Sequence, residues 1–144
     1  KMAYKFIDGV TMADIAFEAT GSSIEKLFES AGQALTNTQV SDLKKIKPEL
    51  EKTIEVKSQN EERLLHDFLQ ELIFLKDAEL LLVSEYMIKV RKTENGMTLN
   101  ATLKGEPIDN TKHEMLVDVK AVSWHLFKLE KVKKGWRAFV ILDV

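Results

Sequence analysis

The segment of residues 64–75 places the strongest constraint on the fold of this 144-residue chain. Its apolar side chains recur at helical spacing and form a wide stripe, made of Leu64, Leu65, Phe68, Leu69, Leu72, Ile73 and Leu75. A stripe of this width must be covered by another element, and a sheet can cover it. Ser58 and Glu61 form a helix-start signal, so we predict a helix over residues 60–76 that packs on a sheet.

A second helix is predicted over residues 23–37. Ser22 and Glu25 have the spacing of a capping box, in which the serine side chain accepts from the backbone N–H of the glutamate and the glutamate side chain accepts from that of the serine. Apolar side chains then recur every three or four positions, at Ile24, Leu27, Phe28, Ala31, Ala34 and Leu35. This helix also needs an apolar partner on one face.

The remaining segments indicate strands, separated by turn signals such as Asn95-Gly96 and by a polar loop after Gly105. The predicted strands cover residues 12–19, 51–58, 80–92, 97–104, 117–131 and 136–142. The order of elements predicts a single α+β domain over residues 1–144, with two layers: two main helices packed on one mostly antiparallel sheet. We also expect the two chain ends to lie near one another.

Composition excludes several classes of function. The chain is 44% hydrophobic and 31% charged, as in an ordinary globular domain, and its net charge of −2 argues against holding nucleic acid by bulk electrostatics. It has no cysteine, which excludes disulfides and thiolate metal sites. No apolar run approaches the ~18 residues of a membrane helix, so we expect no membrane partner, and the lack of cysteine fits a protein of the reducing cytoplasm.

The usual catalytic motifs are missing from the sequence. None of the six glycines falls in a phosphate-binding arrangement, and no serine sits in a nucleophile elbow. The three histidines, His66, His113 and His125, have no zinc spacing. We expect His66 on the surface or rim of its helix, and His125, in a strand pattern after Trp124, to be structural rather than a base. The pattern favours a protein that is not an enzyme.

Two aspartates stand out near the two ends of the chain. Asp14 interrupts an apolar run, and Asp143 follows "FVIL" directly before Val144. If these residues meet, their carboxylates repel one another unless a cation or a partner's basic side chain neutralises them. Oxygen-only ligands select a hard cation such as Ca²⁺ or Mg²⁺. Alternatively, Asp14 is a solvent-exposed strand residue and Asp143 belongs to a frayed tail; the residues alone leave both interpretations open.

The loop of residues 105–118 is the other polar candidate. Asp109, His113, Glu114 and Asp118 cluster in it, and Lys120 follows. Loops often carry function, but a hairpin loop can also simply be solvated. Lys120 can be a surface residue or the ion-pair partner of Asp118.

Four segments together resemble the archease family. They are "TMADIAFEATGSSIEKLFESAGQAL", "LLHDFLQELIFLKDAELLL", "LKGEPIDNTKHEMLVDVKAVSWH" and "AFVILDV", in the order that the family has them. The resemblance covers essentially the whole chain. Its specific parts are "VKAVSWH" and the ending on aspartate and one aliphatic residue.

The resemblance implies a function that spacing cannot show. Archease proteins activate the RtcB-type RNA ligase that joins tRNA halves, promoting its GTP-dependent guanylylation and multiple turnover. The implied partner is therefore that ligase, with tRNA met only through it. The implied metal ligands are Asp14, Asp143 and Val144, with Ca²⁺ favoured and Mg²⁺ or Mn²⁺ as alternatives.

Further partner contacts are expected from the third matching segment, which contains His113, Lys120 and His125; we expect them to matter less than the aspartates. Thr11 and Met12 replace the family's usual His-Thr, so no role of that histidine carries over. Two other classes stay open: a small metal-dependent phosphoester hydrolase, and a general chaperone or interaction module.

Overall fold

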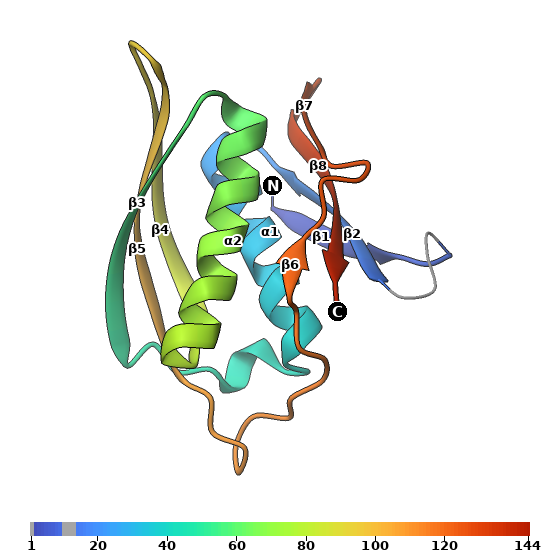
Figure 1. Ribbon diagram of the computed structural model, residues 1–144, viewed down its shortest axis with the longest axis vertical. Helices are drawn as coiled ribbons and strands as arrows, with labels where there is room; N and C mark the ends of the chain where they lie inside the picture. Colours follow the sequence, from blue (N-terminus) through green and yellow to red (C-terminus); the bar gives the residue numbers. More distant parts are fainter. Residues whose placement is uncertain (1, 10–13) are drawn as a thin grey trace.

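Two helices form the centre of the computed structural model, which describes residues 2–9 and 14–144 (Figure 1). They are α1 (Ile24–Gln39) and α2 (Glu61–Glu79). The side chain of Ser23 caps α1 by accepting from the backbone N–H of Lys26, and Asn60 caps α2 by accepting from Arg63. Both predicted helices are confirmed, although each cap is one or two residues later than the sequence signal indicates.

The strands form two sheets, in which every pairing is antiparallel. The first contains β1 (Ala3–Ile7), β2 (Asp14–Gly21), β8 (Gly135–Asp143), β6 (Ala121–Val122) and β7 (Lys128–Val132). Its order is β1-β2-β8, and β6 and β7 both pair with the free edge of β8. The second contains β3 (Leu50–Ser58), β5 (Gly96–Pro107) and β4 (Leu81–Thr93), preceded by a short 3-10 helix, η1 (Leu43–Lys45).

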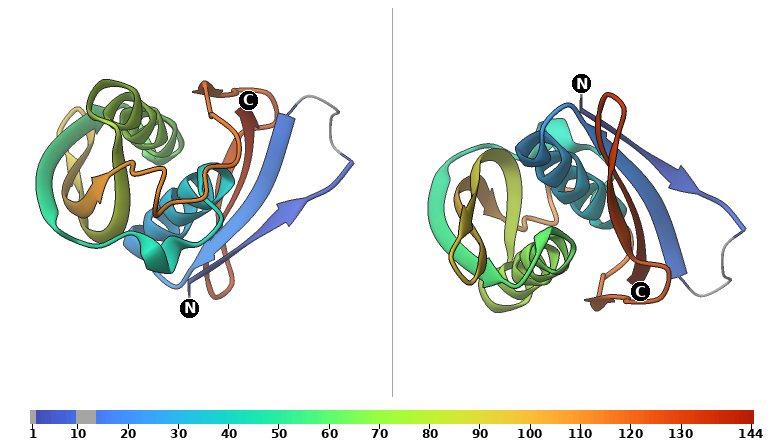
Figure 2. Two further views of the ribbon diagram at one scale, coloured as in Figure 1. Left: turned by 90° about the horizontal axis from the view of Figure 1, so that it is seen from below. Right: turned by 90° about the horizontal axis from the view of Figure 1, so that it is seen from above.

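The helix pair lies between the two sheets, as all three views show (Figures 1 and 2). The expected α+β class is confirmed, but the strands form two sheets rather than one. The expected nearness of the chain ends is wrong: Ala3 pairs with Thr20 at one end of β2, whereas Asp143 pairs with Asp14 at the other.

A continuous apolar core explains this arrangement. The predicted stripe of α2 is buried throughout, and Phe68 packs on Phe28 of α1 with ring centroids 5.6 Å apart. Phe17 of β2 and Leu99 of β5 are also fully buried, so both sheets contribute to the same core. Each helix has apolar neighbours on two sides. One sheet could therefore not cover the whole apolar surface of the helix pair.

The segment of residues 117–131 is not the single strand that its alternation predicts. A turn separates β6 from β7, in which the backbone N–H of Phe127 donates to the carbonyl of Trp124 at 3.2 Å. Leu126 has a φ of 57°, a left-handed conformation that a strand cannot contain. Val122 and Phe127 are buried, while Trp124 and Leu126 are about half exposed, so the apolar residues divide between the core and the surface of the turn.

The loop after β5 is closed at its base by a buried ion-pair network, although most of its residues, Asp109 and Glu114 among them, are exposed to solvent. Glu106 is 5% exposed, and its carboxylate accepts from His113 Nε2 at 2.9 Å and from Lys112 Nζ. The backbone N–H of Lys47 donates to it as well, at 2.8 Å. Burial alone would raise the pKa of Glu106, but these three donors outweigh burial and lower the pKa to about 2.

We predict that Glu106→Gln lowers the free energy of unfolding by about 3 kcal/mol at neutral pH, because three donors converge on a site that needs a carboxylate. Urea denaturation measures this loss. Glu94→Gln, at the exposed β4–β5 turn, is the matched control and should change stability little.

The difference between wild type and Glu106→Gln should also depend on pH. Since the folded-state pKa lies below the unfolded value of about 4.3, the stabilisation is fully present above that value and is lost as pH falls towards 2. A difference that stays constant down to pH ~3 would contradict the ionised network.

Candidate functional site

Asp14 and Asp143 lie directly opposite one another at the end of the first sheet. Asp14 begins β2, Asp143 ends β8, and the two are Cα partners in the antiparallel register. Directly opposed residues in such a pair have Cα atoms about 4.5–5.5 Å apart, with their side chains on the same face. The structure therefore brings together the two aspartates that the sequence singled out from opposite ends of the chain.

β6 completes the surroundings of Asp143. Ala121 pairs with Asp143 from the other side, and the backbone N–H of Lys120 donates to the Asp143 carbonyl at 2.8 Å. Asp143 is thus held between two strands, and it does not belong to a frayed tail. Val144 follows it and is partly buried against the core.

Side chains of α2 hold this part of the chain in place. Both backbone polar groups of Val122 form hydrogen bonds with α2. Its N–H donates to Gln70 Oε1 at 2.5 Å, and its carbonyl accepts from His66 Nε2 at 2.9 Å. Lys76 is 5% exposed, donates to the Val119 carbonyl at 3.1 Å and pairs with Asp118 and Asp77. Lys76, rather than Lys120, is therefore the partner of Asp118.

A hollow of about 310 Å³ opens beside Asp14. Its lining includes Phe6, Asp8, Asn37 and Leu116. Phe6 and Leu116 are 42% and 54% exposed, so the aspartate pair adjoins an accessible surface that is partly apolar.

The donor set suits a hard cation but is incomplete by itself. Within residues 2–9 and 14–144, neither Asp14 nor Asp143 has a Lys, Arg or His partner within 4.0 Å. Nor does this part of the chain contain a group of three or more His, Cys, Asp or Glu side chains placed to hold a metal. A cation here would need an oxygen of Val144, water or a partner in addition to the two carboxylates.

The other predicted residues occupy three different environments. His113 is 2% exposed and serves the Glu106 network, so the expectation that it contacts a partner does not fit. Lys120 is exposed beside Asp143, and His125 is exposed in the β6–β7 turn, where its N–H donates to Ser123 Oγ at 3.0 Å. Thr11 and Met12 lie outside the described residues.

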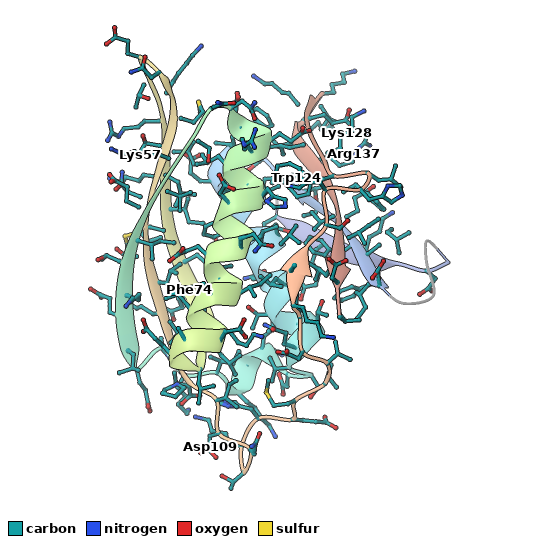
Figure 3. All side chains as sticks on the ribbon, in the orientation of Figure 1. Lys57, Phe74, Asp109, Trp124, Lys128 and Arg137 are labelled. Carbon is teal, nitrogen blue, oxygen red and sulfur yellow. The ribbon has the colours of Figure 1, made fainter. Side chains whose placement is uncertain are left out.

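His66 is a buried residue, so its expected place on the surface or rim is wrong. Its ring stacks on Trp124, with centroids 3.7 Å apart and planes inclined by 7°. The β6–β7 turn covers this side of α2, as the position of Trp124 in Figure 3 shows. No local signal reveals this, because the covering residues lie more than fifty positions away in the sequence.

Known proteins match this chain over nearly its whole length. The model of the Archease protein family matches residues 4–144. The archease proteins of Thermococcus gammatolerans and Pyrococcus abyssi are 37% and 38% identical over 133 residues, which is 92% of this chain and 93% of each relative. This chain belongs to the archease family.

Two solved structures have the same fold as this chain. The solution structure of Methanobacterium thermoautotrophicum protein 1598 superposes with a TM-score of 0.85 at 33% identity, covering 98% of both chains. An archease of Thermotoga maritima, described as a possible chaperone, has a TM-score of 0.63 at 24% identity over 93% of both chains and shares the fold. In the described residues of this archease, no helix is long and apolar enough to cross a membrane.

The electrostatics of the aspartate pair predict that Asp143→Asn, measured by thermal unfolding with EDTA present, leaves the Tm unchanged or slightly higher. The change removes one of two facing like charges. Asp118→Asn removes the same charge but takes a partner from the buried Lys76 ammonium, so it should lower the Tm. A lower Tm for Asp143→Asn of the same size would show that Asp143 has a stabilising partner.

Proposed function

We propose that this archease is a non-catalytic activator of an RtcB-type RNA ligase. It promotes the GTP-dependent guanylylation of the ligase and its multiple turnover on tRNA halves in the cytoplasm. The observation that carries the proposal is the opposition of Asp14 and Asp143 across β2 and β8, at the position where the family resemblance puts a metal site.

The two aspartates would hold a hard divalent cation, with Ca²⁺ favoured over Mg²⁺ and Mn²⁺, and an oxygen of Val144 would join them. Such an ion would supply positive charge and open coordination positions for oxygen ligands of a partner. The protein's own contribution is to fix the two carboxylates on one face. β6 and the side chains of α2 hold Asp143 there.

The partly apolar hollow beside Asp14 supports the proposal that this end of the molecule docks on the ligase. A docking surface combines apolar contact area with a few polar groups at its rim. Phe6 and Leu116 provide the exposed apolar area, and Lys120 stands beside Asp143. Lys120 and His125 are the exposed residues available for further contacts.

The test measures multiple-turnover ligation of tRNA halves by the cognate ligase with GTP. Asp14→Asn, Asp143→Asn and deletion of Asp143 and Val144 should each remove most of the stimulation and abolish the rise in Tm that Ca²⁺ causes. The double variant should be scarcely worse than either single variant, since residues of one site are not additive. Glu94→Gln removes the same charge at the exposed β4–β5 turn and should stimulate like wild type.

Full stimulation by the chain that ends at Leu142 would contradict the proposal. Incubation of the protein with RNA and divalent metal, without ligase, distinguishes the hydrolase alternative, because cleavage abolished by Asp14→Asn would show catalysis by this chain. Equal protection of an unrelated aggregating protein by wild type and Asp14→Asn would show a general chaperone instead.

A further inference from the structure

The hairpin of β7 and β8 carries a concentration of positive charge that the proposed function does not use. Residues 128–137 contain five Lys or Arg and a single Glu, a net charge of +4. Because the whole chain has a net charge of −2, the remainder carries −6. The overall charge therefore conceals a local basic surface.

Three lysines at the end of this hairpin are available to an anion. Glu130 is already engaged, since Arg137 Nη2 pairs with it at 2.8 Å and Lys128 at 3.6 Å. In the described part of the chain, Lys131, Lys133 and Lys134 have no acidic side chain within 4.0 Å. Lysines without an acidic partner on one short hairpin suit a backbone of phosphates, which presents closely spaced negative charges.

An aromatic ring stands among these lysines. Lys131 Nζ lies over the Trp136 ring, 5.9 Å from its centroid, and the half-buried ring also packs against the core. Trp136 and Lys134 line a hollow of about 430 Å³ together with Thr20, Gly21 and Val132. An aromatic ring beside lysines that have no acidic partner is the combination that binds single-stranded nucleic acid, because the base stacks while the lysines neutralise phosphates.

The backbone fixes the hairpin against the rest of the sheet. Gly135 has a φ of 143°, and a Cβ atom there would lie 2.1 Å from the carbonyl oxygen of Gly21. Only glycine permits this approach, which brings the hairpin turn onto the end of β2, where Gly21 is one of the residues that line the hollow. The basic surface is therefore held in position by the sheet.

We propose that the β7–β8 hairpin, through Lys131, Lys133, Lys134 and Trp136, binds the phosphate backbone and a base of single-stranded RNA. Figure 3 labels Lys128 and Arg137, which belong to this hairpin, at the end of the molecule opposite Asp109. β8 joins the hairpin to Asp143, and its nine residues span about 27 Å. The identification of this RNA as the substrate of the ligase rests on the proposed function. The RNA contact itself does not depend on that function.

The experiment measures binding of a short fluorescein-labelled single-stranded RNA to the full chain by anisotropy at several salt concentrations. The variant Lys131→Gln/Lys133→Gln/Lys134→Gln should bind at least about tenfold more weakly, and its slope of log K against log salt should be smaller in magnitude by about 2. The variant Lys44→Gln/Lys45→Gln/Lys47→Gln changes net charge equally around η1. It should bind RNA like wild type.

A second readout locates the base. The chain has two tryptophans, so Trp124→Phe leaves Trp136 alone, and RNA should quench its fluorescence. Equal RNA affinity of the two triple variants, absence of quenching, or equally tight binding of poly-glutamate would each overturn the proposal, the last by indicating an acidic protein partner.

The two proposals fail separately. The hairpin variant should keep the Ca²⁺-induced rise in Tm, and Asp14→Asn should keep RNA binding. Loss of RNA binding in Asp14→Asn would contradict a separate RNA surface. If Asp14→Asn loses ligase stimulation but binds RNA like wild type, the RNA surface on the hairpin is supported.

Discussion

The antiparallel pairing of β2 with β8 is the interaction on which the rest of this structure depends. It runs from Asp14 opposite Asp143 to Gly21 opposite Trp136, and it joins segments from the two ends of the chain. A shift of one residue would turn Phe17 and Val140 out of the core, so burial fixes the register. The same register sets the two aspartates opposite one another.

The segment that supports Asp143 depends in turn on α2. Lys76, Gln70 and His66 bond to Asp118, Val119 and Val122, and the segment so held pairs with the end of β8. The Glu106 network closes the loop that leads into it. The buried side chains of α2 and Glu106 thus position the end of β8, because each hydrogen bond fixes one specific partner, which apolar packing alone would not do.

Local patterns predicted the helices, most strands and the two aspartates, since amphipathic periodicity and an isolated charge in an apolar run are visible in a few neighbouring residues. The division into two sheets, the burial of His66 and Lys76, and the turn at Leu126 escaped prediction. Each depends on a contact between distant segments, such as the stacking of Trp124 on His66. β1 escaped because five residues with one weak alternation do not distinguish a strand from an extended end.

The proposed function requires that Asp14 and Asp143 form one cation site. A titration of the isotope-labelled protein with Ca²⁺, followed through backbone amide resonances, tests it most directly. Binding of Ca²⁺ between the two aspartates should cause saturable shifts confined to the amides around Asp14, Lys120, Ala121 and Asp143, which share one end of the sheet. Absence of saturation there, or saturable shifts centred instead on the loop around Asp109, would contradict it.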